Sequence, residues 1–286
     1  MRILATSKSV CYAGSKHDLV VVVKSAVANF EERKAFRNHI RDQMLRYPIM
    51  KVGHVFSVGL PRSRGGSLLD RDGYLNNFFS PAGELLETVE GNQEELQSEI
   101  AREISTHDDI VLGDYEDTFY NLSWKAVANY RWMSAFCGRN NVKLFMIIDD
   151  DHRFDLAMIA KFMDRVPAAE RNVSIYGKLV KEESAVRLPT WQLLISHKNI
   201  PWDKLPPYLQ GFACLIGPAV VDDVAIATAY TKHSYIGDDL YLGFVYTSLE
   251  MNLVHEPLLY GQHMNPELGR TVMVAHRNIF NRKGLP

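Results

Sequence analysis

Apolar residues in this chain fall into short continuous runs, separated by longer segments in which apolar and polar residues recur at helical spacing. The continuous runs are rich in β-branched residues and show no polar alternation, which is typical of buried strands in a parallel sheet. The longer segments carry apolar residues three and four positions apart, which predicts helices. The predicted strands are residues 18–24, 52–60, 109–112, 144–148 and 172–176, and the predicted helices are residues 31–41, 85–105, 120–137, 156–166 and 220–230.

Turn residues mark the segments between these elements. Residues 61–83 contain Arg-Ser-Arg-Gly-Gly and Asp-Gly, so we expect a loop there. Residues 201–217 begin with several prolines and then become apolar. Strands alternate with helices up to residue 149, and this order predicts an α/β fold with a mostly parallel central sheet flanked by helices.

Three adjacent carboxylates, Asp149, Asp150 and Asp151, directly follow the apolar run 144–148. Burying three like charges together is costly unless a cation is present. Ligands of α/β proteins bind at the carboxyl ends of parallel strands, and carboxylate oxygens suit Mg²⁺, Mn²⁺ or Ca²⁺. The triplet therefore indicates a divalent-metal site, with a solvated acidic turn as the alternative.

A second acidic pair, Asp238 and Asp239, lies far along the chain between glycines and aromatic residues. Two separate aspartate clusters, each at the edge of a predicted element, suggest a site in two parts. One cluster would hold a metal ion, and the other would take part in proton transfer. A helix N-cap is the alternative role for Asp239.

Three arginines, Arg33, Arg37 and Arg41, are spaced four residues apart on one face of the helix predicted at residues 31–41. Guanidinium groups pair bidentately with phosphate oxygens, so this face could hold a diphosphate. A solvated face paired with neighbouring carboxylates is the simpler interpretation from the spacing alone.

Length and composition limit the classes of protein to consider. The chain has 286 residues, 47% of them hydrophobic, which suits one large α/β domain or two small ones. A formal net charge of -2 and a pI near 6.6 give no sign of a nucleic-acid partner. No apolar run approaches the roughly 18 residues of a membrane span.

Three cysteines are too few for a disulfide scaffold, but a bridge between Cys137 and Cys214 is possible.

Several short motifs follow one another in a defined order. They are Lys24-Ser25…Asn29-Phe30…Arg33…Arg37, Phe56-Ser-Val-Gly59, Asp114-Tyr-Glu-Asp-Thr-Phe-Tyr-Asn-Leu-Ser-Trp-Lys125, Asp149-Asp-Asp151, Pro207-Tyr208…Gly211 and Asp238-Asp-Leu-Tyr-Leu-Gly243. In this order and spacing they resemble glycosyltransferase family 31, the β-1,3-galactosyltransferase and β-1,3-N-acetylglucosaminyltransferase group. The resemblance extends over roughly residues 18–280.

The resemblance implies a GT-A-type fold, with a single catalytic domain at residues 18–286 after an N-terminal extension at residues 1–17. It implies an inverting hexosyltransferase that moves galactose or N-acetylglucosamine from a UDP-sugar to the 3-hydroxyl of a glycan on a glycoprotein or glycolipid. The cofactor would be Mn²⁺ or another divalent cation. Members are typically type II membrane proteins of the Golgi. We therefore expect a lumenal Golgi location, an anchor that this chain does not include, and a truncated or atypical member.

The resemblance also implies roles for individual residues. Asp239 would be the general base. The metal ligands would be Asp149, Asp151 and His276, with His263 as a rival for the histidine. The donor would be bound by Ser25, Arg33, Arg37, Lys125, Asp149 and Asp150. The acceptor side would include Pro207, Tyr208, Gly211 and Asp238.

The chain departs from the family pattern beside these positions. Ile147 replaces a lysine two residues before the triplet, and His152-Arg153 replaces Val-Phe after it. Cys214 and Gly217 replace a tyrosine and a serine of the acceptor-side strand. These departures motivate a second interpretation, a catalytically inactive relative that binds sugar or acts as a scaffold.

Overall fold

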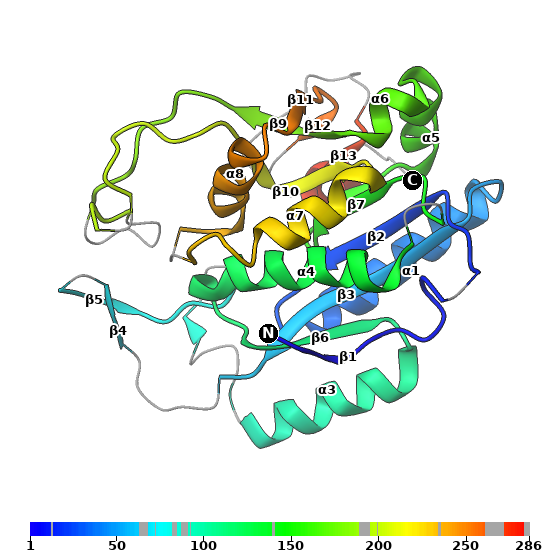
Figure 1. Cartoon of the computed structure of the whole chain (residues 1–286). Helices are drawn as coiled ribbons and strands as arrows, with labels where there is room; N and C mark the ends of the chain where they lie inside the picture. Colours follow the sequence, from blue (N-terminus) through cyan, green and yellow to red (C-terminus); the bar gives the residue numbers. More distant parts are fainter. Residues whose placement is uncertain are drawn as a thin grey trace.

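The computed structural model of the chain describes residues 1–12, 14–62, 68–71, 73–81, 85, 86, 91, 93–138, 141–188, 195–198, 200–233, 236–260 and 272–282. Within this part of the chain, an eight-stranded sheet with the strand order β1-β6-β3-β2-β7-β10-β9-β11 forms the centre (Figure 1). Its strands are β1 (Ile3–Ala5), β2 (Leu19–Lys24), β3 (Val52–Leu60), β6 (Ile110–Glu116), β7 (Phe145–Asp149), β9 (Ser174–Val180), β10 (Tyr208–Ile216) and β11 (Asn252–His255).

Helices cover both faces of this sheet. They are α1 (Phe30–Arg46), α3 (Gln93–His107), α4 (Leu122–Phe136), α5 (Leu156–Arg165), α6 (Ala168–Asn172), α7 (Val221–Ala227), α8 (Asp238–Ser248) and α9 (Arg277–Arg282), with short 3-10 turns η1 (Phe119–Asn121) and η2 (Pro218–Val220). Figure 1 shows α4 and α7 crossing the front of the sheet and α1 behind it. The described residues also form two small sheets, one of β12 (Leu259–Tyr260), β13 (Val274–His276) and β8 (His152–Phe154), the other of β4 (Leu68–Arg71) and β5 (Tyr74–Asn77).

The central sheet is mostly parallel, as the sequence predicts. Strands β6, β3, β2 and β7 are parallel neighbours, and β11 runs parallel to β9. Of the described strands in this sheet, only β1 and β10 run in the opposite direction. The parallel strands of the first half bring their carboxyl ends to one edge of the sheet, which is where the acidic triplet lies.

Strand β2 explains why its apolar run has no polar alternation. Val20 and Val22 contact the hydrophobic core on the α4 side of the sheet, whereas Leu19, Val21 and Val23 contact the core on the α1 side. All five side chains are at most 1% exposed. Because both faces of the strand are covered, every position must be apolar.

Several short elements differ from the expectation. The segment 61–83, expected as a loop, contains the hairpin β4–β5 in its described part. Its exposed residues, such as Tyr74 and Leu75, carry no period-2 burial pattern that could have predicted it. The helix expected at residues 85–105 begins at Gln93 among the described residues, and residues 87–90 and 92 lie outside them.

The N-terminal segment packs against the body of the protein at two points. Strand β1 pairs with β6, where Ile3 is opposite Gly113. A disulfide joins Cys11 to Cys137, just after the end of α4. The bridge considered between Cys137 and Cys214 is therefore wrong, because Cys214 lies within the sheet on β10 and the N-terminal segment brings Cys11 to Cys137 instead.

Helix α8 lies unusually close to the start of β10. A Cβ atom at Gly243 would be 2.6 Å from Cβ of Tyr208 and 3.1 Å from the carbonyl oxygen of Pro207. Glycine at this position lets the helix approach the strand, and this approach places the first turn of α8 near the carboxyl ends of the central strands. Among the described residues, none of the helices combines the length and apolar character needed to cross a membrane.

Candidate active site

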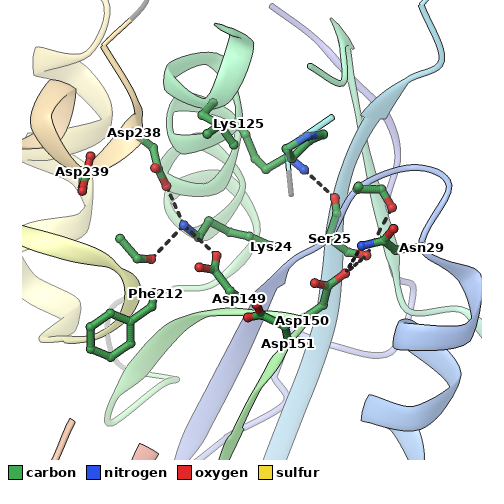
Figure 2. Close-up of a pocket in the computed structure, with 14 residues that line it drawn as sticks. Lys24, Ser25, Asn29, Lys125, Asp149, Asp150, Asp151, Phe212, Asp238 and Asp239 are labelled. Carbon is green, nitrogen blue, oxygen red and sulfur yellow. Dashed lines mark hydrogen bonds and ion pairs between the residues drawn. The ribbon is translucent and has the colours of Figure 1, made fainter. Parts of the chain in front are cut away.

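A cavity of about 450 Å³ opens at the carboxyl ends of β2 and β7 (Figure 2). Lys24, the last residue of β2, is the register partner of Asp149, the last residue of β7. Both strands therefore end at the same level and present their next residues to one space. The cavity is lined by Lys24, Ser25, Ala26, Asn29, Pro81, Leu122, Lys125, Asp149, Asp150, Asp151, Gly211, Phe212, Asp238 and Asp239.

The Lys24 ammonium joins the two acidic clusters. Its Nζ lies 2.9 Å from Oδ1 of Asp149 and 2.6 Å from Oδ2 of Asp238, and it donates to the carbonyl oxygen of Gly211 at 2.8 Å (Figure 2). Burial lowers the pKa of Lys24, but the carboxylates of Asp149 and Asp238 outweigh burial and raise it, so the side chain stays charged. The Lys24 ammonium thereby offsets part of the repulsion between the carboxylates of Asp149 and Asp238, which are distant in sequence.

Asp150 is buried at the base of the cavity and is held by hydrogen bonds. Its Oδ2 accepts from Oγ of Ser25 at 2.6 Å and from Nδ2 of Asn29 at 3.1 Å. Burial raises the pKa of Asp150, and both hydrogen bonds oppose that rise. Lys125 approaches from α4, where its Nζ donates to the carbonyl oxygen of Ser25 and lies 2.9 Å from Oδ1 of Asp117.

Arg33 lies beneath this layer and does not line the cavity. It is fully buried, and its guanidinium donates to both oxygens of Glu103, to the carbonyl oxygens of Ala26 and Val27, and to Oγ of Ser25. Since Ser25 in turn donates to Asp150, Arg33 acts on the cavity indirectly, through the lining residues Ser25 and Ala26.

The other two arginines of this helix differ from Arg33 and from each other. Arg37 pairs with Glu103 and Asp109, each at 2.7 Å, whereas Arg41 is exposed and bonds Oδ1 of Asn38. The helix face therefore carries a buried ion-pair network at Arg33 and Arg37 and a solvated residue at Arg41. Neither a diphosphate-binding face nor a solvated face therefore describes all three arginines.

Replacing Arg33 with alanine is expected to lower the free energy of unfolding by about 3 kcal/mol, because Glu103 would keep Arg37 as its only described guanidinium partner and two buried carbonyl oxygens would lose a charged donor. Denaturant unfolding measures this loss. Arg41→Ala is the matched control from the same helix and should change stability by less than about 0.5 kcal/mol. Equal stability of the Arg33 variant and the wild type would contradict the structural role of this ion pair.

Asp238 and Asp239 occupy the first turn of α8. Gly237 precedes them with φ +83°, a left-handed conformation that favours glycine, and it is the N-cap residue. Asp239 is therefore inside the first turn, and its Oδ1 accepts a hydrogen bond from the Leu240 amide at 2.7 Å. Burial and the neighbouring Asp238 carboxylate raise the pKa of Asp239 to about 7. A carboxylate with this pKa can accept a proton near neutral pH.

Of the predicted acceptor-side residues, Tyr208 and Gly211 lie on β10 and Pro207 just before it, whereas Asp238 is on α8. Gly211 lines the cavity, and a Cβ atom there would be 3.2 Å from Oδ1 of Asp238 and 3.5 Å from Nζ of Lys24. Glycine thus leaves room for the Lys24–Asp238 pair. Tyr208 donates its hydroxyl to Glu183. Pro207 and Tyr208 are not among the residues that line the cavity.

The predicted metal ligands gather around Asp151. Its Oδ2 is 3.5 Å from Nε2 of His276, and its Oδ1 is 2.5 Å from Nδ1 of His152. Burial lowers the pKa of His276, which favours the neutral imidazole that ligates metals. Ligand atoms of Asp149, Asp151 and His152 all lie within 4.8 Å of one another. This set of carboxylate oxygens and imidazole nitrogens fits a divalent cation such as Mn²⁺. The rival histidine, His263, lies outside the described residues.

Several residues of the site were not assigned a role from sequence, and three of them have side chains of chemical interest. Lys24, Asn29 and Phe212 line the cavity beside the predicted residues. Lys24 had a usable signal, because it ends a buried apolar run in the same way that Asp149 does. Phe212 lies within the apolar end of segment 201–217 and has no such signal.

A mostly parallel sheet with an acidic triplet at the end of a central strand, facing a second acidic cluster across one cavity, is the arrangement expected of a GT-A-type fold. A family model described as Galactosyltransferase matches residues 85–257, which is more than half of the chain. The chain belongs to this family, the group of β-1,3-galactosyltransferases and β-1,3-N-acetylglucosaminyltransferases that its motifs predict, and the predicted family is confirmed.

Curated proteins similar to this chain are named as β-1,3-glycosyltransferases. Human UDP-GlcNAc:betaGal beta-1,3-N-acetylglucosaminyltransferase 9 is 26% identical over 239 residues, which covers 83% of this chain and 54% of that protein. Lactosylceramide 1,3-N-acetyl-beta-D-glucosaminyltransferase A of Xenopus laevis is 23% identical, covering 60% and 45%. Beta-1,3-galactosyltransferase brn of Drosophila melanogaster is 25% identical, covering 58% and 50%. The chain thus spans about half the length of the curated relatives it matches.

Among solved structures, the crystal structure of a glycosyltransferase involved in the glycosylation of the major capsid of PBCV-1 is similar to the chain. The match has a TM-score of 0.41 and 8% sequence identity, and it covers 90% of this chain and 93% of that one. A similarity of this size is too low to bear on function.

Proposed function

We propose that the chain transfers galactose or N-acetylglucosamine from a UDP-sugar to the 3-hydroxyl of an acceptor glycan, with inversion at the anomeric carbon and with the help of Mn²⁺ or another divalent cation. The observation that carries the proposal is the position of Asp239 across one cavity from the acidic triplet, with Lys24 between the two clusters. The family supports a sugar nucleotide as the donor.

Direct displacement needs a base on the side of the sugar opposite to the leaving diphosphate. Asp239 would accept the proton of the acceptor hydroxyl while the hydroxyl oxygen forms a bond to the anomeric carbon. The bond from that carbon to the UDP oxygen breaks, and the electron pair leaves with UDP. Asp238 lies 2.6 Å from Nζ of Lys24, and its carboxylate adds to the effect of burial in raising the pKa of Asp239.

The opposite side of the cavity would bind the donor. Ser25, Lys125, Asp149 and Asp150 lie together there, and Arg33 and Arg37 would act from below by fixing the loop that carries Ser25. Asp149, Asp151 and His276 would hold the cation. A bound cation would stabilise the negative charge of the departing diphosphate. Pro207, Tyr208, Gly211 and Asp238 would form the acceptor side.

The experiment that tests this function measures UDP release from UDP-galactose and UDP-N-acetylglucosamine, with and without Mn²⁺, against a panel of glycan acceptors. We expect release that requires both the metal and an acceptor, together with a glycan product extended at a 3-hydroxyl. Donor binding without acceptor-dependent release from either sugar nucleotide would instead favour the catalytically inactive relative, an alternative motivated by the departures at Ile147, Cys214 and Gly217.

We also propose that the protein acts in the lumen of the secretory pathway, in the Golgi, on a glycoprotein or glycolipid. The Cys11–Cys137 disulfide supports this location, because such bridges persist in oxidising compartments and are rare in the cytosol.

A further inference from the structure

His152 is a buried imidazole directly after the acidic triplet. It begins strand β8, and its register partner on β13 is His276. Register partners on antiparallel strands project from the same face, and the two rings meet edge to face with their centroids 5.5 Å apart. Phe212, a wall of the cavity, stacks on His152 at 5.1 Å. Two imidazoles therefore lie together beside Asp151.

The hydrogen bonding of His152 is incomplete. The side chain is only 3% exposed, and Nδ1 lies 2.5 Å from Oδ1 of Asp151. Its Nε2 is buried and has no hydrogen-bond partner among the described residues. A buried ring nitrogen without a partner costs free energy. One ligand atom from each of Asp149, Asp151 and His152 lies within 4.8 Å of the others, so a cation held by the two carboxylates would be within reach of this ring.

We propose that His152 is a metal ligand, so that the cation site of this chain contains two imidazoles and two carboxylates: His152, His276, Asp149 and Asp151. The inference rests on the proposed function only in taking this cluster as the donor's metal site. The residue that the family pattern places here, valine, offers no ligand atom. A second imidazole is thus a property of this chain and not of the family pattern.

A second nitrogen ligand changes which cation the site prefers. Carboxylate oxygens suit Mg²⁺, Ca²⁺ and Mn²⁺, whereas imidazole strengthens binding of Co²⁺, Ni²⁺ and Zn²⁺. The site should therefore discriminate more strongly for Co²⁺ over Mg²⁺ than the same site with valine at position 152.

Metal titration of the untagged full chain tests the assignment, using calorimetry with Co²⁺, Mn²⁺ and Mg²⁺ on the wild type, His152→Val and His152→Asn. Asparagine can still donate a hydrogen bond to Asp151 but supplies no imidazole nitrogen. Both variants should lose about tenfold or more in Co²⁺ affinity, with little change for Mg²⁺. Pulsed EPR of the Mn²⁺-loaded chain should detect two imidazole nitrogens in the wild type and one in each variant. His255→Val, an exposed histidine on β11, is the matched control and should behave as wild type.

Two results would overturn the proposal. Wild-type Co²⁺ affinity in His152→Asn but not in His152→Val would mean that the imidazole only orients Asp151. Wild-type affinity in both variants would mean that it contributes nothing. The outcome is separable from the proposed function. If His152 ligates the metal but no sugar is transferred, the ligand assignment stands and the proposed function fails. If sugar is transferred but His152 does not ligate the metal, the proposed function stands and the ligand assignment fails.

Discussion

Replacing Asp239 with asparagine is expected to reduce sugar transfer by about 10²–10⁴-fold, the usual effect of losing a positioned general base. Asparagine keeps the size of the side chain and can still accept from the Leu240 amide, but it cannot take a proton. UDP binding with Mn²⁺ should hardly change, because the triplet is intact. Initial rates with a saturating donor measure the loss.

The pH profile gives an independent check on the same residue. A base is active when deprotonated, and the pKa of Asp239 is raised to about 7. Transfer by the wild type should therefore fall as the pH drops through about 7 and reach a plateau above it. The residual activity of Asp239→Asn should lose this dependence.

The structure also determines which control is suitable. Asp238→Asn is not a mild neighbour substitution, since Asp238 pairs with the buried Lys24 at 2.6 Å. Asp223→Asn, an exposed aspartate on α7, is a better control and should retain full activity. Near-normal transfer by Asp239→Asn would exclude Asp239 as the base, and inactivity of Asp238→Asn alone would not identify Asp238 as the base because of its pair with Lys24. Full activity of both would place the base elsewhere.

Replacing Asp151 with alanine is expected to abolish Mn²⁺-dependent UDP binding, with a loss in metal affinity of at least about 100-fold. Its carboxylate lies between the imidazoles of His152 and His276, so its removal takes away the centre of the ligand set. Calorimetric titration of UDP in the presence of Mn²⁺ measures the effect. The exposed Asp164, replaced by alanine, serves as the control.

Asp149→Ala should have a similar effect on UDP binding, but it is the less specific test. Asp149 is also a partner of Lys24, so its loss alters the charge balance on both sides of the cavity. Unchanged UDP affinity in Asp149→Ala and Asp151→Ala alike would refute the metal assignment.

Burial explains which parts of the fold could be predicted from sequence. Strands β2 and β7 are covered on both faces, and their unbroken apolar runs mark them within one residue of the observed bounds. Strands β8, β12 and β13 have only two or three residues, which is too short for any period to appear. They form because they pair with one another, and that pairing depends on tertiary contacts.

In the candidate site, too, local features could be predicted from sequence, and contacts that depend on tertiary structure could not. The aspartates could be predicted because each cluster stands at the edge of an element recognisable in sequence. Their pairings could not be predicted. The order of strands in the sheet brings Lys24 to Asp149, the packing of α8 against β10 brings Asp238 to Lys24, and the packing of α3 brings Glu103 to Arg33. The ligand role of His152 depends on its pairing with His276, which lies more than a hundred residues later in the sequence.

Strand β1 has a practical consequence for any shortened form of the protein. A fragment beginning at residue 18, the boundary predicted from sequence, would lose the strand that covers β6 and would also lose Cys11. The backbone groups of β6 that pair with Ile3 and Ala5 would become available to other copies, and uncovered edges of this kind promote aggregation. Cys137 would be left as an unpaired thiol able to crosslink two molecules. Strand β1 and Cys11 thus cover a strand edge and a thiol that such a fragment would expose.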